Sequence, residues 1–195
     1  MLMPSLNLEP RDILKMEFEY AQETAEQAQD DRTAIMNLYL LLVGGVGSIV
    51  VGLSQSGSGV ENSPRSAIAL LFALLAVTGF FVFMKLVRLR QAWFDSVRAM
   101  NRIKQFYLDR FPDLDKAFLW KPDTIPARSK PWTITFNLCL LVAILDSVAL
   151  AIAVNFLSLR TFIEYLPEGS AAVMYFLWQL WFYFFQLRPP DPENQ

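Results

Sequence analysis

The sequence predicts an all-α integral membrane protein in which four transmembrane helices form two hairpins. Apolar residues make up 54% of the 195 residues and charged residues 18%, below the roughly 25% that is usual in soluble domains. The apolar residues gather in four segments, and a bilayer core about 30 Å thick needs about 20 such residues. No polar stripe runs along these segments, which argues against buried helices of a soluble protein. They cover residues 36–54, 66–84, 132–156 and 171–187.

The residue types that are absent exclude several classes of site. The chain has no histidine, and Cys139 is its one cysteine. Zinc sites of the usual kind, histidine-activated nucleophiles, histidine-ligated haem and an intrachain disulfide are therefore excluded. The stretch GGVGS is no phosphate-binding loop, because it lies inside an apolar segment. We expect a protein that is not an enzyme and that has no cofactor and no metal site.

The first helix is predicted to begin at Pro10 and to continue into the span at 36–54. Positions 11–37 contain no glycine and no proline, and good helix formers dominate there, while proline suits a first helical position. A narrow contact stripe repeats at spacings of three and four along the polar part. It consists of Leu14, Phe18, Ala21, Ala25 and Ala28.

Small residues repeat every four positions inside the first span, at Gly44, Ser48 and Gly52. Such a face lets two helix backbones approach closely within a membrane. We expect it to pack against the second span or against another protomer. A flexible gate is the alternative use, because glycine lowers the stiffness of a helix.

The second helix is predicted to cross the membrane at 66–84 and to continue as far as Pro112. Its polar part carries a stripe that matches the first one. That stripe consists of Trp93, Val97, Met100, Ile103 and Tyr107. Residues 1–111 are thus expected to form a long antiparallel hairpin whose polar ends make a cytoplasmic helical stalk.

The two halves of this stalk carry complementary charge. Residues 1–35 hold eight acidic and three basic side chains, whereas residues 85–131 hold eleven basic and five acidic ones. An exposed ion pair contributes about 0–1 kcal/mol, so we expect the charges to set register and partner choice. The charges pair either within one chain or between subunits. The stalk itself is either a solvated stem that supports the spans or a sensor and oligomerisation element. The pairs expected from equal depth are Asp30 and Asp31 with Arg88 and Arg90, Glu23 with Arg98, and Glu19 with Arg102.

The connection at 112–131 is predicted to differ from both helices. It contains four prolines, which prevent a long helix. Apolar side chains alternate there with lysines, a pattern that fits a short element at an anionic membrane surface. A simple connector is the alternative reading. The apolar residues are Leu114, Phe118, Leu119 and Trp120.

The second hairpin is predicted to cover 132–187, with 188–195 as a cytoplasmic tail. Asp146 is the one acidic or basic residue deep inside a predicted span. An unpaired buried carboxylate is costly, so we expect it to be protonated, paired or hydrated. Depth along each span predicts a polar cluster of Asp146, Gln179, Ser48 and Thr78. This cluster is either a hydrogen bond between helices, from Asp146 to Gln179, or a pore-lining or ion-sensing site.

Several aromatic residues are expected to anchor the spans at the membrane interfaces and to face lipid, as tryptophan and tyrosine commonly do. They are Trp132, Trp178, Trp181, Tyr39, Tyr165, Tyr175 and Tyr183.

The distribution of basic residues predicts the orientation. The 85–131 segment carries eleven of the seventeen lysines and arginines, whereas the loops at 55–65 and 157–170 carry one each. Short loops rich in lysine and arginine stay in the cytoplasm. We therefore expect a multi-pass protein of a bacterial inner (plasma) membrane with both termini in the cytoplasm. The same surface location explains the basic segment without nucleic acid.

Residues 10–111 resemble small bacterial helical membrane effectors of the SLATT type. The likeness rests on the acidic helix that enters the first span and on LRQAWFDSVRAMNRIKQFYLDRF, which leaves the second. Such proteins occur with defence and nucleotide-signalling modules and commonly have two spans, so the second hairpin of this chain is an addition. The resemblance implies no catalytic residues.

Two functions follow as expectations. The first is an oligomeric pore-forming or membrane-perturbing effector that is gated through its cytoplasmic stalk. The second is a structural or assembly subunit of a larger membrane complex. A small transporter or membrane enzyme ranks third, because one buried acid is a thin basis for proton coupling. The expected partners are the lipid bilayer, further copies or other membrane subunits, and a cytoplasmic protein or ligand at the stalk.

Overall fold

A computed structural model describes residues 9–55, 65–116, 125, 127–157 and 169–188. Over these residues the chain forms four α-helices and one 3₁₀ turn, and no strand. The predicted all-α class is confirmed for this part of the chain.

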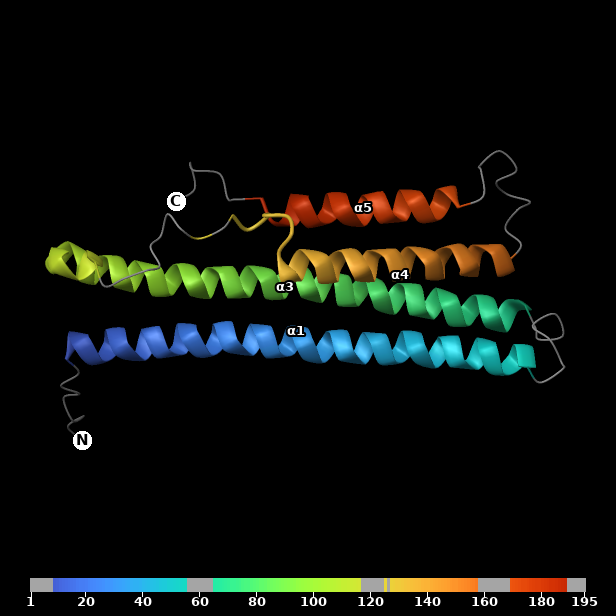
Figure 1. The fold of residues 1–195 in the computed structure, drawn as a ribbon, viewed down its shortest axis with the longest axis horizontal. Helices are drawn as coiled ribbons and strands as arrows, with labels where there is room; N and C mark the ends of the chain where they lie inside the picture. Colours follow the sequence, from blue (N-terminus) through green and yellow to red (C-terminus); the bar gives the residue numbers. More distant parts are fainter. Residues whose placement is uncertain (1–8, 56–64, 117–124, 126, 158–168, 189–195) are drawn as a thin grey trace, which may run out of the picture. The chain divides into compact units, whose positions relative to one another are not determined.

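The two longest helices are α1 (Pro10–Gln55) and α3 (Arg65–Arg110), each of 46 residues. Both run without a break in Figure 1, and at 1.5 Å per residue each is about 70 Å long. The predicted start at Pro10 is confirmed. α3 ends just before Pro112, because a residue that precedes proline avoids helical geometry, and the 3₁₀ turn η1 (Pro112–Lys116) follows.

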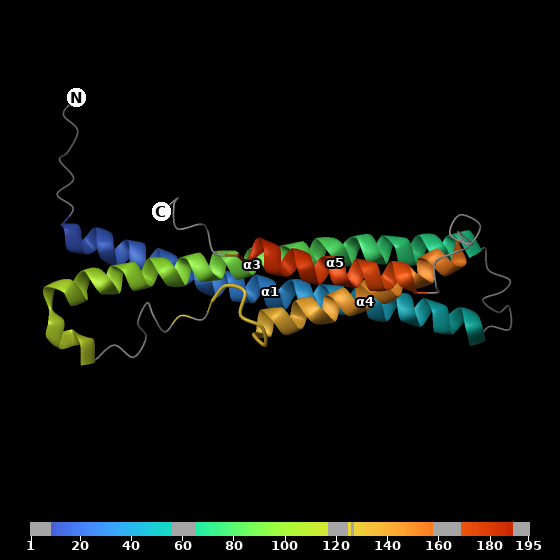
Figure 2. The same ribbon diagram turned by 90° about the horizontal axis from the view of Figure 1, so that it is seen from above.

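The two shorter helices are α4 (Ile134–Phe156), of 23 residues, and α5 (Ser170–Gln186), of 17 residues. Thr133 caps α4, since its hydroxyl accepts a hydrogen bond from the amide N–H of Phe136 at 3.2 Å. Gly169 precedes α5 with φ at 87°, a left-handed conformation that glycine adopts without strain. α4 and α5 pack against each other (Figure 2).

Three helices, α1, α3 and α4, are long and apolar enough to cross a membrane. α5 is shorter: its 17 residues extend about 25 Å, against a hydrocarbon core of about 30 Å. Three of the four predicted spans therefore meet the requirement for length and composition. The fourth span stays a prediction.

The chain divides into two compact units, and α1 and α3 contribute to both. The first unit comprises positions 1–31 and 89–128, and the second comprises 32–88 and 129–195. In the first unit Ala21, Ala25 and Ala28 are buried, and Leu14 and Phe18 are half-buried. The predicted stripe of α1 is thus its inward face in this unit.

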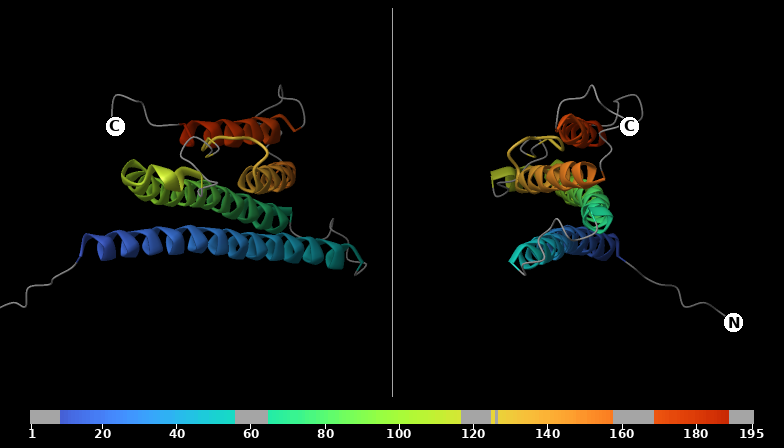
Figure 3. Two further views of the ribbon diagram at one scale, coloured as in Figure 1. Left: turned by 60° about the vertical axis from the view of Figure 1, so that its left-hand side comes forward. Right: turned by 90° about the vertical axis from the view of Figure 1, so that its right-hand side faces the viewer.

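The second unit has an apolar core to which all four helices contribute. Figure 3 shows α4 between α1 and α5 in this unit. Apolar side chains of all four helices meet there, and burial of such surface stabilises a fold by about 25 cal/mol per Å². The most deeply buried of them are Tyr39, Phe83, Leu86, Val87, Cys139, Val142, Ala143, Tyr183 and Leu187.

Candidate functional site

The candidate site is a carboxylate, that of Asp146, buried inside the second unit. α4 turns one face toward the core at spacings of three and four residues, and Asp146 lies on that face. Its side chain is 0% exposed to solvent. The buried residues of this face are Thr135, Cys139, Val142, Ala143, Asp146, Ser147, Ala149 and Ala153.

α5 supplies two hydrogen-bond donors to one oxygen of this carboxylate. The Gln179 side chain donates from Nε2 to Asp146 Oδ2 at 2.6 Å, and the Tyr175 hydroxyl donates to the same oxygen at 2.9 Å. Residues four positions apart lie on one face of a helix, so α5 presents both donors together. The structure therefore contains the Asp146 to Gln179 hydrogen bond that was one of the two predicted uses of the cluster.

α3 approaches the carboxylate through a glycine. A Cβ atom added at Gly79 would lie 2.6 Å from Asp146 Oδ1, 2.7 Å from its Cγ and 2.8 Å from the Tyr39 hydroxyl. Real Cβ atoms essentially never show such distances, so any larger residue at this position would force Asp146 or Tyr39 to shift. The absence of a side chain at Gly79 lets Asp146 and Tyr39 both rest against the backbone of α3.

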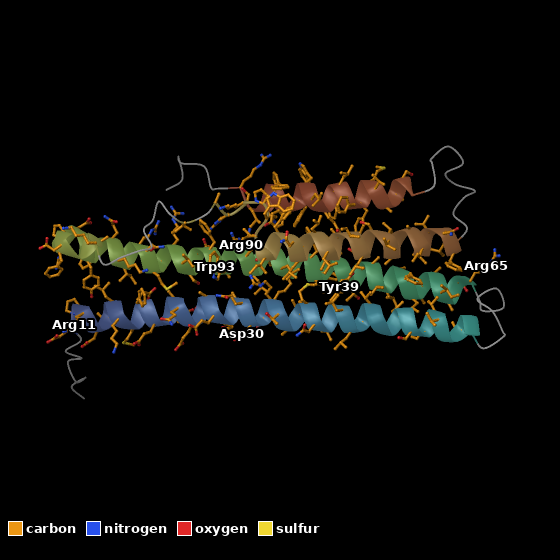
Figure 4. The ribbon with its side chains drawn as sticks, viewed as in Figure 1. Arg11, Asp30, Tyr39, Arg65, Arg90 and Trp93 are labelled. Atoms are coloured by element: carbon orange, nitrogen blue, oxygen red, sulfur yellow. The ribbon has the colours of Figure 1, made fainter. Side chains whose placement is uncertain are left out.

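α1 contributes Tyr39, which points into the second unit (Figure 4) and is fully buried. Its hydroxyl and Asp146 Oδ1 both lie within 2.8 Å of the same point beside Gly79. Side chains from α1, α4 and α5 and the backbone of α3 thus meet at one carboxylate.

Several polar atoms at this meeting point have no hydrogen-bond partner among the described residues. They include Asp146 Oδ1, the Tyr39 hydroxyl and Gln179 Oε1. Buried polar groups in proteins are paired in more than about 90% of cases. Such a group of unpaired oxygens around one acid therefore calls for a chemical explanation.

Two members of the predicted polar cluster do not join it. The Ser48 hydroxyl donates to the carbonyl oxygen of Gly44, and the Thr78 hydroxyl donates to that of Leu74, each at 2.8 Å within its own helix. The prediction was wrong for both because it used only depth along the span. Thr78 is next to Gly79 in sequence, but one residue turns a helix by about 100°, so its side chain leaves on a different side.

The small-residue face of α1 is open. Among the described residues, no heavy atom outside the local helix lies within 4 Å of a Cβ added at Gly44 or Gly52, and Ser48 is exposed. The core-facing side of α1 instead carries Met36 and Tyr39. Packing of the small-residue face against the second span of the same chain was therefore a wrong prediction. Packing against another protomer stays a prediction.

The aromatic residues predicted as anchors divide into exposed and inward-facing ones, and the anchoring role of the exposed ones stays a prediction. Trp132, at 82% exposure, together with Trp178 and Trp181, is exposed. Tyr39 and Tyr183 are fully buried, and Tyr175 binds Asp146, so these tyrosines are core residues instead of lipid-facing anchors. Tyr165 lies outside the described residues.

The stalk charges have partners that sequence reasoning missed. In the first unit the Arg128 guanidinium pairs with Asp95 and lies 4.9 Å from the centroid of the Phe94 ring. The Arg90 guanidinium lies 4.8 Å from the centroid of the Trp93 ring (Figure 4). Its Nε donates to the carbonyl oxygen of Arg128 at 3.5 Å.

These contacts of Arg90 and Arg128 attach the end of the connector to α3.

The stalk also contains an ion pair within a single helix. Glu19 pairs with Lys15 of its own helix at 3.7 Å. Of the apolar connector residues, Phe118, Leu119 and Trp120 lie outside the described residues, as does the side chain of Leu114. The pairs expected from equal depth between Asp30, Asp31 or Glu23 and the basic helix stay predictions, as does the interfacial role of the connector.

The site offers one carboxylate among neutral donors and acceptors. Within the described ranges no three Cys, Asp or Glu side chains gather in a way that could hold a metal ion. A comparison of the chain with protein-family models, with curated proteins and with solved structures finds no match.

Proposed function

We propose that this chain is a non-enzymatic integral membrane protein that acts as an oligomeric pore-forming or membrane-perturbing effector. The observation that carries the proposal is the open face of α1, on which Gly44, Ser48 and Gly52 meet no other part of the chain that the structure describes. In lipid, helices associate through close backbone packing at small residues. A face of this kind suits the helix of a second copy, and a ring of such contacts would enclose a path through the membrane.

The surface of the second unit supports placement in a bilayer. Large apolar side chains of every helix are exposed there, and exposed apolar surface fits lipid better than water. α5 reaches the lower limit of about 17 residues for a span. Examples of the exposed side chains are Leu41, Leu70, Phe81, Ile144, Val148, Met174 and Trp181.

The proposed topology has four spans, both termini in the cytoplasm and a bacterial-type inner membrane as host. It is supported by the eleven basic residues of the 85–131 segment and by the positive-inside rule. In this arrangement the first unit, with its charged helices, faces the cytoplasm. There it would receive the signal or protein partner that gates the assembly by raising the fraction of open pores above a basal level, in line with the resemblance to SLATT-type effectors.

The experiment that tests this function is leakage of a trapped dye from vesicles that contain the purified full-length chain. We expect the wild type to make the vesicles leak. The double variant Gly44→Leu, Gly52→Leu should lose most or all of this leakage. At neither position would an added Cβ meet another helix of the described chain, so the new side chains should block contacts between copies and leave the fold intact. The matched control is Val77→Phe, which adds bulk at an exposed position of α3 and should leak like the wild type. Vesicles that stay sealed with the wild-type chain would overturn the proposal.

A structural or assembly subunit of a larger membrane complex is the second candidate. The exposed aromatic side of α5 favours it, because rings such as those of Trp181 and Phe185, stacked at 5.0 Å between centroids, are common at protein interfaces. This function predicts that the chain leaves the membrane only together with other subunits and that it does not make vesicles leak.

A further inference from the structure

We propose that the buried carboxyl group of Asp146 holds an internal water molecule, which bridges its Oδ1 atom to the hydroxyl group of Tyr39. The water then joins α1 to the carboxyl group that α4 and α5 already share. This inference does not depend on the pore proposal, because it concerns a site inside one chain.

The first argument is the set of hydrogen bonds that the described residues do not make. Asp146 and Tyr39 are both fully buried, and neither Asp146 Oδ1 nor the Tyr39 hydroxyl has a hydrogen-bond partner among those residues. Gln179 Oε1, on the amide that donates to Asp146 Oδ2, is a further buried acceptor without one. A buried water in a protein typically makes about three hydrogen bonds to polar groups of this kind. The site therefore offers the partners that an internal water needs.

The second argument is the distance between the two oxygens. Asp146 Oδ1 and the Tyr39 hydroxyl oxygen lie 2.6 Å and 2.8 Å from one point, the position of a Cβ added at Gly79. Their separation is therefore at most the sum of these two distances. A hydrogen bond between two oxygens spans about 2.5–3.0 Å, so two such bonds reach from one oxygen to the other. No hydrogen bond joins them directly, and one water molecule suffices to link them.

The third argument is that a water serves both oxygens in either charge state of the acid. Beside an ionised carboxylate, the water donates to Asp146 Oδ1 and accepts the O–H of Tyr39. Beside a neutral acid with its proton on Oδ1, the water accepts that proton in a hydrogen bond and donates to the Tyr39 oxygen. Water has two donors and two acceptors, and a tyrosine hydroxyl both donates and accepts. The bridge is therefore independent of the charge on Asp146.

The bridge lies where α1 meets the rest of the second unit. The side of α1 that carries Tyr39 and Met36 belongs to the apolar core of this unit, whereas the small-residue face of the helix is open. A water-mediated hydrogen bond is nearly as favourable in enthalpy as a direct one. The water thus gives α1 a polar contact with α4 although no side-chain hydrogen bond joins Tyr39 to Asp146.

The test is solid-state NMR of the full-length chain in vesicles of deuterated lipid, with magnetisation transferred from water protons to labelled carbons. Thr78–Gly79 is the one Thr-Gly pair in the sequence and Cys139 the one cysteine, so selective labelling gives each position its own signal. Both residues are buried, and Cys139 lies in the apolar core. We expect transfer to the Gly79 Cα to be several-fold faster than transfer to the Cys139 Cα.

Two variants and a matched control locate the water. Tyr39→Phe and Asp146→Leu each remove one of its partners, so transfer to Gly79 should fall to the rate seen at Cys139. Ser48→Ala also removes a hydroxyl group from α1, but that hydroxyl bonds within its own helix. This control should keep the wild-type rate.

Two results would overturn the inference. If transfer to Gly79 in the wild type is as slow as transfer to Cys139, no water lies beside the carboxyl group, and this comparison needs no variant that might fail to fold. If transfer is fast but Tyr39→Phe leaves it unchanged, the water does not bridge Asp146 to α1. Neither result bears on whether the chain makes vesicles leak, so the two proposals fail separately.

Discussion

At the scale of single residues, four side chains and one glycine account for the candidate site. Asp146 and Gln179 were predicted to meet because each is a polar residue near the middle of an apolar segment, and they lie 2.6 Å apart. Tyr39 and Tyr175 were not found, because tyrosine in an apolar segment was read as an interfacial anchor. A signal existed for Tyr175, because it lies four positions before Gln179 and a helix places both on one face. Depth gave no signal for Tyr39, which is the fourth residue of its segment, whereas Asp146 is the fifteenth of its own.

Gly79 gives the most direct prediction at this scale. In Gly79→Ala the new Cβ would lie 2.6 Å from Asp146 Oδ1, so the carboxylate and Tyr39 must shift. Overpacking of this kind costs about 1–3 kcal/mol, which we expect to appear as a lower thermal unfolding midpoint in detergent. The matched control is Gly45→Ala on α1, where the added methyl group meets nothing and helix propensity improves by about 0.8–1 kcal/mol. Equal midpoints for both variants would contradict the close approach at Gly79.

A double-mutant cycle tests the bond between α4 and α5. Asp146→Leu and Gln179→Leu together should cost less than the sum of the single changes, with a coupling of about 0.6–1.7 kcal/mol, as for polar contacts between membrane helices. The cycle of Asp146→Leu with Thr78→Val should show no coupling, since Thr78 bonds within its own helix. Denaturant titration in mixed micelles measures both. Coupling between Asp146 and Thr78, together with no coupling between Asp146 and Gln179, would contradict the proposed contact between α4 and α5.

At the scale of elements, the sequence predicted where the long helices begin and end. It did not predict which side of each helix faces its neighbours. Runs of helix formers and the positions of Pro10 and Pro112 predicted α1 and α3 to within a few residues. Depth along a helix can be counted from sequence. The side of a helix that meets a neighbour depends on packing, and in the apolar segments every side is apolar, so periodicity carries little information. That is why the sequence left open whether the small-residue face of α1 packs against the second span or against another protomer, whereas among the described residues this face is open.

The start of α4 gives a prediction at this scale. Thr133→Ala removes the cap that accepts from the Phe136 amide, and loss of such a cap costs about 0.5–2 kcal/mol. Thr133→Ser keeps the hydroxyl and should stay close to the wild type. Thermal unfolding in detergent, followed by circular dichroism, measures both variants. A serine variant that is as unstable as the alanine variant would show that the hydroxyl is not the relevant group.

At the scale of the whole molecule, the proposed function depends on what covers α1. Its own chain covers the side that carries Met36 and Tyr39 and leaves the side with Gly44, Ser48 and Gly52 open. The composition and the clustering of apolar residues into four segments predicted a membrane protein, because both can be read directly from the sequence. It did not predict which surfaces remain free for partners, since that depends on how the four helices share their contacts.

The mass of the detergent-purified complex tests the central claim most directly. Light scattering with subtraction of the detergent contribution should show a closed assembly of four or more copies for the wild type. The double variant Gly44→Leu, Gly52→Leu should run as a smaller species with the same helical content. A wild-type chain that is monomeric, or that is recovered only together with other membrane subunits, would contradict the oligomeric effector and favour the assembly subunit.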